Sequence, residues 1–456
     1  MPYSFLTLGQ AKQALIQRLY VATNQFFTDA EIGLYLIESL QIFNAFANFY
    51  RQEFTFTARP GVTWYDLTDI TNLPNTLRPL TTTDTALVQL IEYHLLEPLT
   101  STYPLIWIGS KQFAITDLLN ALQQMRDQLI SDSGCTITES LVAAVPGRTF
   151  LPDTAISLRR VTWLPTSGFG YTPNNLRPSD LWSDQSFTAG FPQLPPGYPQ
   201  MYRRSTEPPL SFDVDIQPAV PGQYDILTLN AGLALSTIQP SIMPVPNDWC
   251  SIIKWGAMAQ LFGRDSSAAD YLRAQYCLTR YKQGVAAMLA APALIGARIN
   301  DVPVSITGLT DADFYAANWQ GQAPGSPTAI YYAGMNLLAL AAAPDSNGPY
   351  SVTASVVRNM VLPVADSDYL QIGRDDVSPV LDHSQHIAMF KGGGEEFTQT
   401  FPLFQNFMRH CALYNSKLAA LSPYLEMLDG RSREDERLNP MFSKVTPATT
   451  ETANGR

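Results

Sequence analysis

The stretch LSFDVDIQPAVPGQYDILTL, residues 210–229, has an echo 126 residues later in NLLALAAAPDSNGPYSVTAS, residues 336–355. In each stretch an apolar run leads into a Pro- and Gly-containing turn, and a second apolar run follows. Each stretch therefore predicts a β-hairpin with one buried face. The matched pairs are Phe212 with Leu338, Val214 with Leu340, Pro218 with Pro344, Gly222 with Gly348, Tyr224 with Tyr350, and Ile226 with Val352. A repeated strand, turn and strand favours a duplicated architecture over a catalytic site.

The N-terminal part of the chain contains a second echo. A helix is predicted in FFTDAEIGLYLIESLQIFNAFANFY, residues 26–50, because Thr28 and Glu31 have the spacing of a capping box. Apolar residues recur at helical spacing after this cap. The next stretch, EFTFTARPGVTWYDL at residues 53–67, alternates and contains a Pro-Gly turn, so it predicts a hairpin.

The same plan returns in residues 112–154. QFAITDLLNALQQMRDQLI predicts a helix near Thr116-Asp117, and TITESLVAAVPGRTFLPDT predicts a hairpin around a second Pro-Gly turn. The two helix starts lie 88 residues apart and the two turns 86 residues apart. An internal duplication is the economical explanation, and chance similarity of two helix–hairpin segments is the alternative.

Helical sequence follows both copies of the predicted strand pair. Residues 245–289 predict two helices broken near Gly263, with Asn247 or Asp248 capping the first and Ser266 or Ser267 capping the second. VLDHSQHIAMF and the sequence after it, residues 380–421, predict another helix pair, broken at KGGGEE. We therefore expect the two halves to share one order of strands and helices.

The expected fold class is α+β: a bundle of long packed helices with an antiparallel, hairpin- or sandwich-like β part, internally duplicated. Residues 1–165 form a helix–helix–hairpin region with its own duplication, and residues 166–206 form a long irregular connection rich in Pro and Gly. Residues 207–295 and 296–425 each hold a hairpin and a helix pair. Residues 426–456 are charged and then Thr-rich, and we expect a flexible C-terminal arm.

Composition narrows the classes of function. The chain has 456 residues, of which only 15% are charged, and its net charge is −11. An acidic chain does not wrap nucleic acid by neutralising phosphates, although it can line a channel through which DNA slides. The four cysteines are widely spaced and predict buried free thiols in a reducing compartment. They are Cys135, Cys250, Cys277 and Cys411.

Motifs of catalysis and metal binding are missing. The four histidines, His94, His383, His386 and His410, do not form HExxH, and we expect them at the surface or at an interface. The glycines of KGGGEE do not form a phosphate-binding loop, and GxSxG is absent. We expect no enzyme activity, no metal and no cofactor.

Targeting signals are also missing. The N-terminus has no basic region followed by an apolar one, and the most apolar run, residues 328–344, is too short to span a bilayer. This run predicts strand and turn. We expect a soluble protein made in the cytoplasm.

Two segments are candidate contact regions. PPGYPQMYRRSTEPP, residues 195–209, combines Tyr and Arg, which protein interfaces favour, and a plain solvated loop is the alternative. Its candidate residues are Tyr198, Tyr202, Arg203 and Arg204. In the C-terminal arm the candidates are Arg431, Arg433, Arg437, Met441 and Phe442.

The order of these features resembles the head-to-tail adaptor, or connector, proteins of tailed bacteriophages. The resemblance rests on LTLGQAKQALIQRL, FTDAEIGLYLIESLQIFNAF and FTFTARPGVTWYDL, followed by LRRVTWL, a P-x-x-x-G-x-Y turn and VPNDWCSIIKWGAMAQLFG. It covers residues 5–290 in layout, and residues 325–420 match as a second copy of the C-terminal part. This chain departs from the family in its length. Two N-terminal-like segments precede two C-terminal-like segments, so the extra half is expected as a decoration or as a second tier of a ring.

The resemblance implies a structural virion protein in the neck of a tailed phage, assembled in the host cytoplasm. It implies a homo-oligomeric ring of twelve copies that binds the portal protein above and a tail or nozzle protein below. Genomic DNA would pass through without specific binding, no membrane would be involved, and the arm would dock on the portal. Another tail, collar or baseplate protein is the alternative, and a cell-wall or glycan hydrolase is a more distant one.

Overall fold

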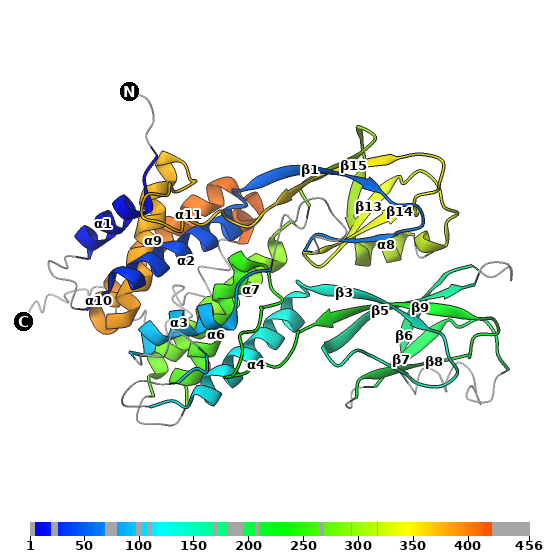
Figure 1. Cartoon of the computed structure of the whole chain (residues 1–456), viewed down its shortest axis with the longest axis horizontal. Helices are drawn as coiled ribbons and strands as arrows, with labels where there is room; N and C mark the ends of the chain where they lie inside the picture. The colour runs from blue at the N-terminus through cyan, green and yellow to red at the C-terminus, as the bar shows by residue number, and fades with distance from the viewer. Residues whose placement is uncertain are drawn as a thin grey trace, which may run out of the picture.

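The computed structural model describes residues 5–19, 26–68, 80–96, 103–106, 112–166, 172–180, 195–205, 209–264, 269–292, 294–316 and 318–421. Within these ranges the chain is a mixed α+β protein with ten α-helices and three sheets, most of whose strand pairs are antiparallel. Apart from α8, the helices gather at one end of the long axis, and the strands lie at the other (Figure 1).

The elements form two units that lie side by side, the upper and lower rows of Figure 1. The inserted unit, residues 80–292, is continuous in sequence. Its elements are α3 (Asp84–Leu95), α4 (Ile115–Ser133), β3 (Ile137–Ala143), β4 (Thr149–Phe150), β5 (Ala155–Pro165), β6 (Asn174–Ser179), β7 (Met201–Arg204), β8 (Ser211–Val214), β9 (Gly222–Asn230), η2 (Asn247–Trp249), α6 (Cys250–Phe262) and α7 (Tyr271–Ala290).

The split unit combines both ends of the described chain, residues 5–68 and 294–421. From the N-terminal side come α1 (Leu8–Arg18), α2 (Asp29–Ala47), β1 (Arg51–Ala58) and β2 (Trp64–Asp66). From the C-terminal side come β10 (Gly296–Ile299), β11 (Val302–Pro303), β12 (Ser305–Gly308), α8 (Leu309–Tyr315), η3 (Trp319–Gly321), β13 (Ala329–Ala333), β14 (Leu337–Ala341), β15 (Tyr350–Val357), α9 (Arg374–Gly392), α10 (Gly394–Gln399) and α11 (Phe401–Tyr414).

The strands of the two units follow the same order. The inserted unit has β3-β9-β5-β6-β7-β8-β4, and the split unit has β1-β15-β10-β11 and β12-β13-β14-β2. In the inserted unit, β6 pairs with β5 through its first half and with β7 through its second half. In the split unit two strands take the place of β6: β11 pairs with β10, and β12 pairs with β13. The register agrees as well: Tyr202 lies opposite Val214, and Ile330 lies opposite Leu340.

Each unit folds its strands around an apolar core of its own. In the split unit the core side chains come from β1, β10 and β15 on one side and from β2, β13 and β14 on the other. In the inserted unit they come from β5, β6, β7, β8 and β9. The third and largest cluster joins the helices of both units.

The predicted hairpins are wrong. β8 pairs with β7 and β4, whereas β9 pairs with β3 and β5. Likewise β14 pairs with β13 and β2, whereas β15 pairs with β1 and β10. The hairpins predicted in residues 53–67 and 136–154 are wrong too, because β1 and β3 pair with β15 and β9 rather than with the strands that follow them. Alternation reports one buried face, but it does not report which strand lies alongside.

The predicted helices form, with corrections at their caps. Thr28 caps α2 through the predicted capping box with Glu31. The breaks near Gly263 and in KGGGEE are confirmed, since α6 ends at Phe262 and Gly393 separates α9 from α10. The predicted caps of α6 and α7 are wrong: α6 continues from η2, and Asp270 caps α7. Ser266 and Ser267 lie outside the described residues.

The predicted segments do not coincide with the two units. Residues 1–165 contribute β1 to one unit and β3 to the other. Residues 166–206, predicted as irregular, contain the strands β6 and β7. The apolar run 328–344 is strand and turn as predicted, since it forms β13 and β14. Across the described ranges, no helix combines the length and apolar character needed to cross a membrane.

Candidate functional site

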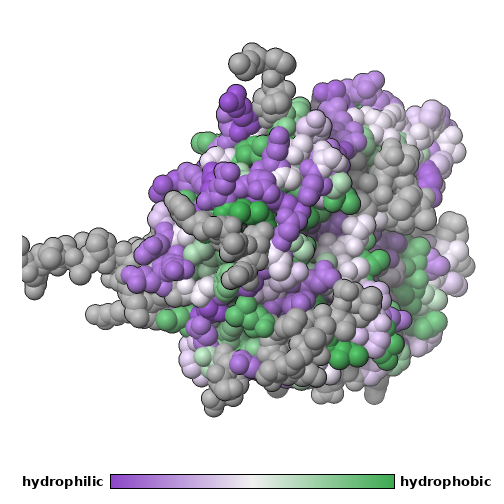
Figure 2. Space-filling view, turned by 60° about the vertical axis from the view of Figure 1, so that its left-hand side comes forward, coloured by the Kyte–Doolittle hydropathy of each residue, from purple (hydrophilic) through white to green (hydrophobic). Residues whose placement is uncertain are grey.

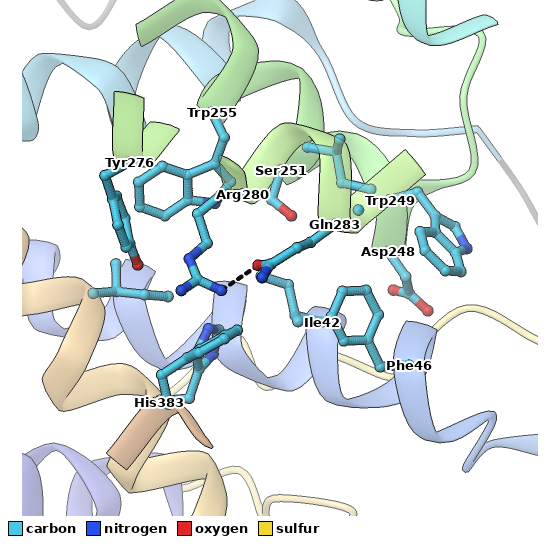
Figure 3. A pocket seen from close by; sticks show the side chains of 14 residues that line it. Ile42, Phe46, Asp248, Trp249, Ser251, Trp255, Tyr276, Arg280, Gln283 and His383 are labelled. Atoms are coloured by element: carbon cyan, nitrogen blue, oxygen red, sulfur yellow. Dashed lines mark hydrogen bonds between the residues drawn. The ribbon is translucent and has the colours of Figure 1, made fainter. Parts of the chain in front are cut away.

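The seam between the two units is the best-developed polar arrangement in the described chain. On the helical side, α2, α9 and α11 of the split unit pack against η2, α3, α6 and α7 of the inserted unit. A cavity of about 30 Å³ lies between them (Figure 3). It has room for water and for no organic ligand. Its lining includes Ile42, Phe46, Trp255, Tyr276, Gln283 and His383.

A buried ion pair crosses the seam. Nζ of Lys254 on α6 lies 2.5 and 2.6 Å from the two carboxylate oxygens of Glu38 on α2, and both side chains are fully buried. Burial lowers the pKa of Lys254, although Glu38 opposes this effect. Such a pair fixes geometry more than it adds stability, because both charges lose their hydration.

Arg280 of α7 lies over aromatic rings of the split unit. Its guanidinium carbon is 3.5 Å from the ring centroid of Phe404, and the group also donates to Oε1 of Gln283. Figure 3 shows the Arg280 head group between Tyr276 and His383, with the Gln283 amide directed toward Ile42. The arginine therefore connects α7 to α11 by stacking.

A hydrogen-bonded chain also crosses the seam. The Tyr276 hydroxyl lies 2.6 Å from Nε2 of His386, and Nδ1 of the same ring lies 2.8 Å from Oγ1 of Thr400. The Thr400 hydroxyl in turn donates to the carbonyl of Phe397. These groups hold α7, α9 and the start of α11 together, and all are buried.

The expectation of surface or interface histidines needs correction, because three of the four are buried inside the chain. His94 is enclosed by Tyr35, Trp255 and Phe390, and His383 stacks on Phe407 with 4.2 Å between centroids. Burial, reinforced by neighbouring cations, holds the pKa of His94 and His383 well below the usual value. His386 is buried too, while His410 is half-buried beside Asp376. These residues act as core aromatic groups.

The sheet end of the seam has its own polar contacts. Asn336 of the split unit exchanges two hydrogen bonds, of 3.0 and 2.9 Å, with the backbone of Ile137. The indole of Trp64 donates to the buried carboxylate of Asp225. Arg160 forms two bonds of 2.9 and 3.0 Å with Asp313. The seam is therefore polar and specific along its length, and it joins the two units into one body.

The four cysteines are buried free thiols, as predicted, and burial raises the pKa of each of them. Among the described residues, no cluster of His, Cys, Asp and Glu could hold a metal ion. The Glu38–Lys254 pair lies inside the core.

An open groove lies on the helical side of the inserted unit. It has a volume of about 550 Å³ and lies along α4 and α7. Leu278 and Leu289 are 41% and 62% exposed there, beside Gln128, Asp132 and Lys282. Figure 2 brings the helical end forward and shows apolar patches interspersed with hydrophilic residues.

The predicted contact segment at residues 195–209 is largely built into the inserted unit. Tyr198 is half-buried against Trp163, Tyr202 is buried on β7, and Arg203 lies opposite Asp213 on β8. Arg204 is exposed at the end of β7. Tyr202 therefore faces the core rather than a partner, because alternate residues of a strand point to opposite sides. The arm candidates Arg431, Arg433, Arg437, Met441 and Phe442 lie outside the described residues.

Sequence reasoning missed the seam residues. Glu38 and Lys254 are 216 positions apart, so no local pattern links them. One signal was present: each is a lone charge inside an apolar helix, in LYLIESLQIF and in SIIKWGAMAQLF. A charge at such a position needs a buried partner.

Comparisons with known proteins add no relative: no family model matches the chain, and no curated protein matches it.

Proposed function

We propose that this chain is a structural virion protein of a tailed phage, a head-to-tail adaptor that forms a homo-oligomeric ring beneath the portal. In this role it performs no reaction and needs no cofactor. The ring continues the DNA channel toward a tail or nozzle protein, and genomic DNA passes through without specific binding. The net charge of −11 suits a bore that repels the DNA backbone.

The observation that carries the proposal is the way the two units meet. They share one strand order, yet the split unit brings α2 to the seam beside α9 and α11, whereas the inserted unit brings α3 beside the equivalent helices α6 and α7. Contacts between unlike faces of similar bodies can continue from one body to the next, which is how rings are built. We also propose that the units arose by duplication, with one copy inserted into the other.

The resemblance stated above supplies the remaining parts of the proposal. Twelve ring positions are expected, and residues 426–456 are proposed to dock on the portal as an arm. If one unit rather than one chain fills a ring position, six chains supply the twelve positions. A mass measurement of the assembled ring distinguishes the two copy numbers.

The test is to mix the purified chain with its portal ring and to image the complex, and the virion, by cryo-electron microscopy. We expect density for the chain directly beneath the portal, around the channel. Density in the tail, collar or baseplate would replace the adaptor proposal with the second structural role. A chain that is absent from the particle and does not bind the portal contradicts both.

A further inference from the structure

We infer that the open α4–α7 groove of the inserted unit receives the outer face of α11 from a second copy of this chain. The contact between copies then repeats the seam inside the chain. This inference deepens the ring-forming part of the proposed function and rests on it. The groove is the position where the repeated seam would continue.

The helices of the two units can be placed in register from their contacts. The C-cap residues of α2 and α4 are Asn48 and Gly134; both have a left-handed backbone, and they lie 86 residues apart. An ion pair provides a second marker. Lys391 pairs with Glu31 at 2.9 Å, and Arg264 pairs with Asp117 at 2.8 Å.

The same markers relate the C-terminal helices. Glu31 and Asp117 differ by the same 86 positions, and Lys391 and Arg264 differ by 127. His383 then corresponds to Gly256 on α6. His383 stacks on Phe407 of α11, and Gly256 approaches Tyr281 of α7, so α11 and α7 correspond with an offset of 126.

In this register, residues that close the seam correspond to residues that line the groove. Ile42 and Phe46 of α2 are buried in the seam, and their equivalents on α4 are Gln128 and Asp132, which are exposed. Phe404 of α11 is buried beneath Arg280, and its equivalent is Leu278. A two-fold arrangement would cover both sets equally. Here one set is covered and the other is open.

The complementary face is also open. Across the seam the inserted unit presents Tyr276, Arg280 and Gln283 of α7, all buried. Their equivalents on α11 have an offset of 126 and are all exposed: Pro402, Asn406 and Arg409. The chain therefore contains this contact once, at the seam. The two surfaces that would form it a second time, the α4–α7 groove and the outer face of α11, are both exposed.

Charge fits the open halves together. In Figure 3 the Gln283 side chain is directed toward Ile42, one helical turn from Phe46. The equivalent contact between copies places Arg409 over Gln128, within one turn of the Asp132 carboxylate. Both Arg409 and Asp132 are exposed in the single chain. An Arg–carboxylate pair at this position favours association and fixes its register.

The chain's own C-terminal segment is the competing occupant. Leu421, the last described residue, lines the groove, and residues 422–456 continue from it. A second copy is favoured because it would cover both open faces and would pair Arg409 of one copy with Asp132 of the other. The segment would account for the groove alone.

Charge reversal in the full chain tests the inference by sedimentation velocity or mass photometry. We expect wild-type chains to associate, and Asp132→Arg or Arg409→Asp alone to raise the dissociation constant by at least about tenfold. Combining the two reversals should restore most of the association. Asp153→Arg and Arg148→Asp, exposed in the turns on either side of β4, are matched controls that should leave it unchanged.

A cross-link tests the register directly. Leu278→Cys and Asn406→Cys chains, mixed under mild oxidation, should form a disulfide dimer that neither variant forms alone, since the native thiols are buried. Wild-type chains that stay monomeric, single reversals that still associate, or association that appears only after residues 422–456 are removed would each overturn the inference. Portal binding and position in the virion are measured separately, so a failed docking contact is distinguishable from a failed adaptor assignment.

Discussion

The split and inserted units share one strand order but place different residues at equivalent positions of their helices. Phe46 is buried in the seam where Asp132 is exposed, and Ile42 is buried where Gln128 is exposed. The difference extends to the first helices. Thr7 and Thr83 cap α1 and α3, and 11 residues later His94 is buried where Arg18 is partly exposed and pairs with Asp382. Equivalent helix positions are therefore apolar where the neighbouring unit covers them and polar where it does not.

Chain continuity is the second difference between the units. In the described chain all partners of β3 to β9 lie within residues 80–292, whereas β1 and β2 pair with β15 and β14, 271 to 306 positions away. The inserted unit can thus complete its sheet alone. The N-terminal part of the split unit cannot.

The largest expected effect comes from cutting the chain at the unit boundary. Residues 80–292 expressed alone should show strand-containing circular dichroism and a cooperative thermal transition, because their sheet is complete. Residues 5–68 alone should show no cooperative transition, because β1 and β2 lose every strand partner. A folded N-terminal fragment, or an unfolded inserted unit, would refute this account of the comparison.

The second-largest effect is expected at the two equivalent ion pairs, which should contribute unequally to the free energy of unfolding. Lys391→Met leaves Glu31 buried without its cation, and we expect a loss of about 3–5 kcal/mol in the free energy of unfolding. The matched variant Arg264→Met should cost less than about 1 kcal/mol, because Arg264 and Asp117 are 46% and 36% exposed against 9% and 0% for Lys391 and Glu31. Urea titrations measure both. Equal losses would show that burial does not separate the two pairs.

The His94 position should give the units different pH dependence. The pKa of His94 is lowered in the folded chain, so the unfolded chain takes up a proton first, below about pH 6.5, and stability is lost as the pH falls. His94→Phe should reduce this loss by up to about 1.4 kcal/mol per pH unit. Arg18→Gln, at the equivalent position, should leave the slope unchanged between about pH 6.5 and pH 5. Unfolding curves across this range decide the matter, and an unchanged slope in His94→Phe would argue against a buried neutral ring.

The smallest expected effect lies in the sheets. Burial and nearby Asp225 raise the pKa of Glu139 on β3 to about 7, whereas the equivalent residue on β1 is Thr55, which contacts Thr353. The folded chain keeps this proton to higher pH than the unfolded chain, so stability is lost as the pH rises from about 4.5 toward 7. Glu139→Gln should therefore raise the melting temperature at pH 8 and change it less at pH 5. A lower melting temperature at pH 8 would contradict the predicted sign.

Local signals predicted the helices and failed for the strand partners. The cap at Thr28 and the break at Gly263 are encoded by neighbouring residues, and both were predictable. The repeat of residues 210–229 in residues 336–355 was visible too, but each copy crosses between non-adjacent strands rather than forming a hairpin. The order of two N-terminal-like and two C-terminal-like segments looked irregular in sequence. In the structure the inner pair forms one unit and the outer pair forms the other.

The candidate contacts were less predictable. Tyr and Arg in residues 195–209 suggested a surface segment, yet Tyr202 belongs to a buried strand. The seam depends on pairs such as Glu38 with Lys254, which only the folded chain brings together. Composition identifies residue types that interfaces favour, and it does not identify which side of a strand or helix they occupy.

The pairing of β1 with β15 also means that β1 is synthesised long before the strand with which it pairs. Ribosomes add about 5–20 residues per second, so β1 leaves the ribosome roughly 15–60 s before its partner strand exists. During that interval the whole inserted unit is made and can fold beside an N-terminal segment whose strand edges are unpaired. One face of β1 is polar, with Arg51, Glu53, Thr55 and Thr57 exposed. A polar face reduces the tendency of an unpaired strand to aggregate before its partner is made.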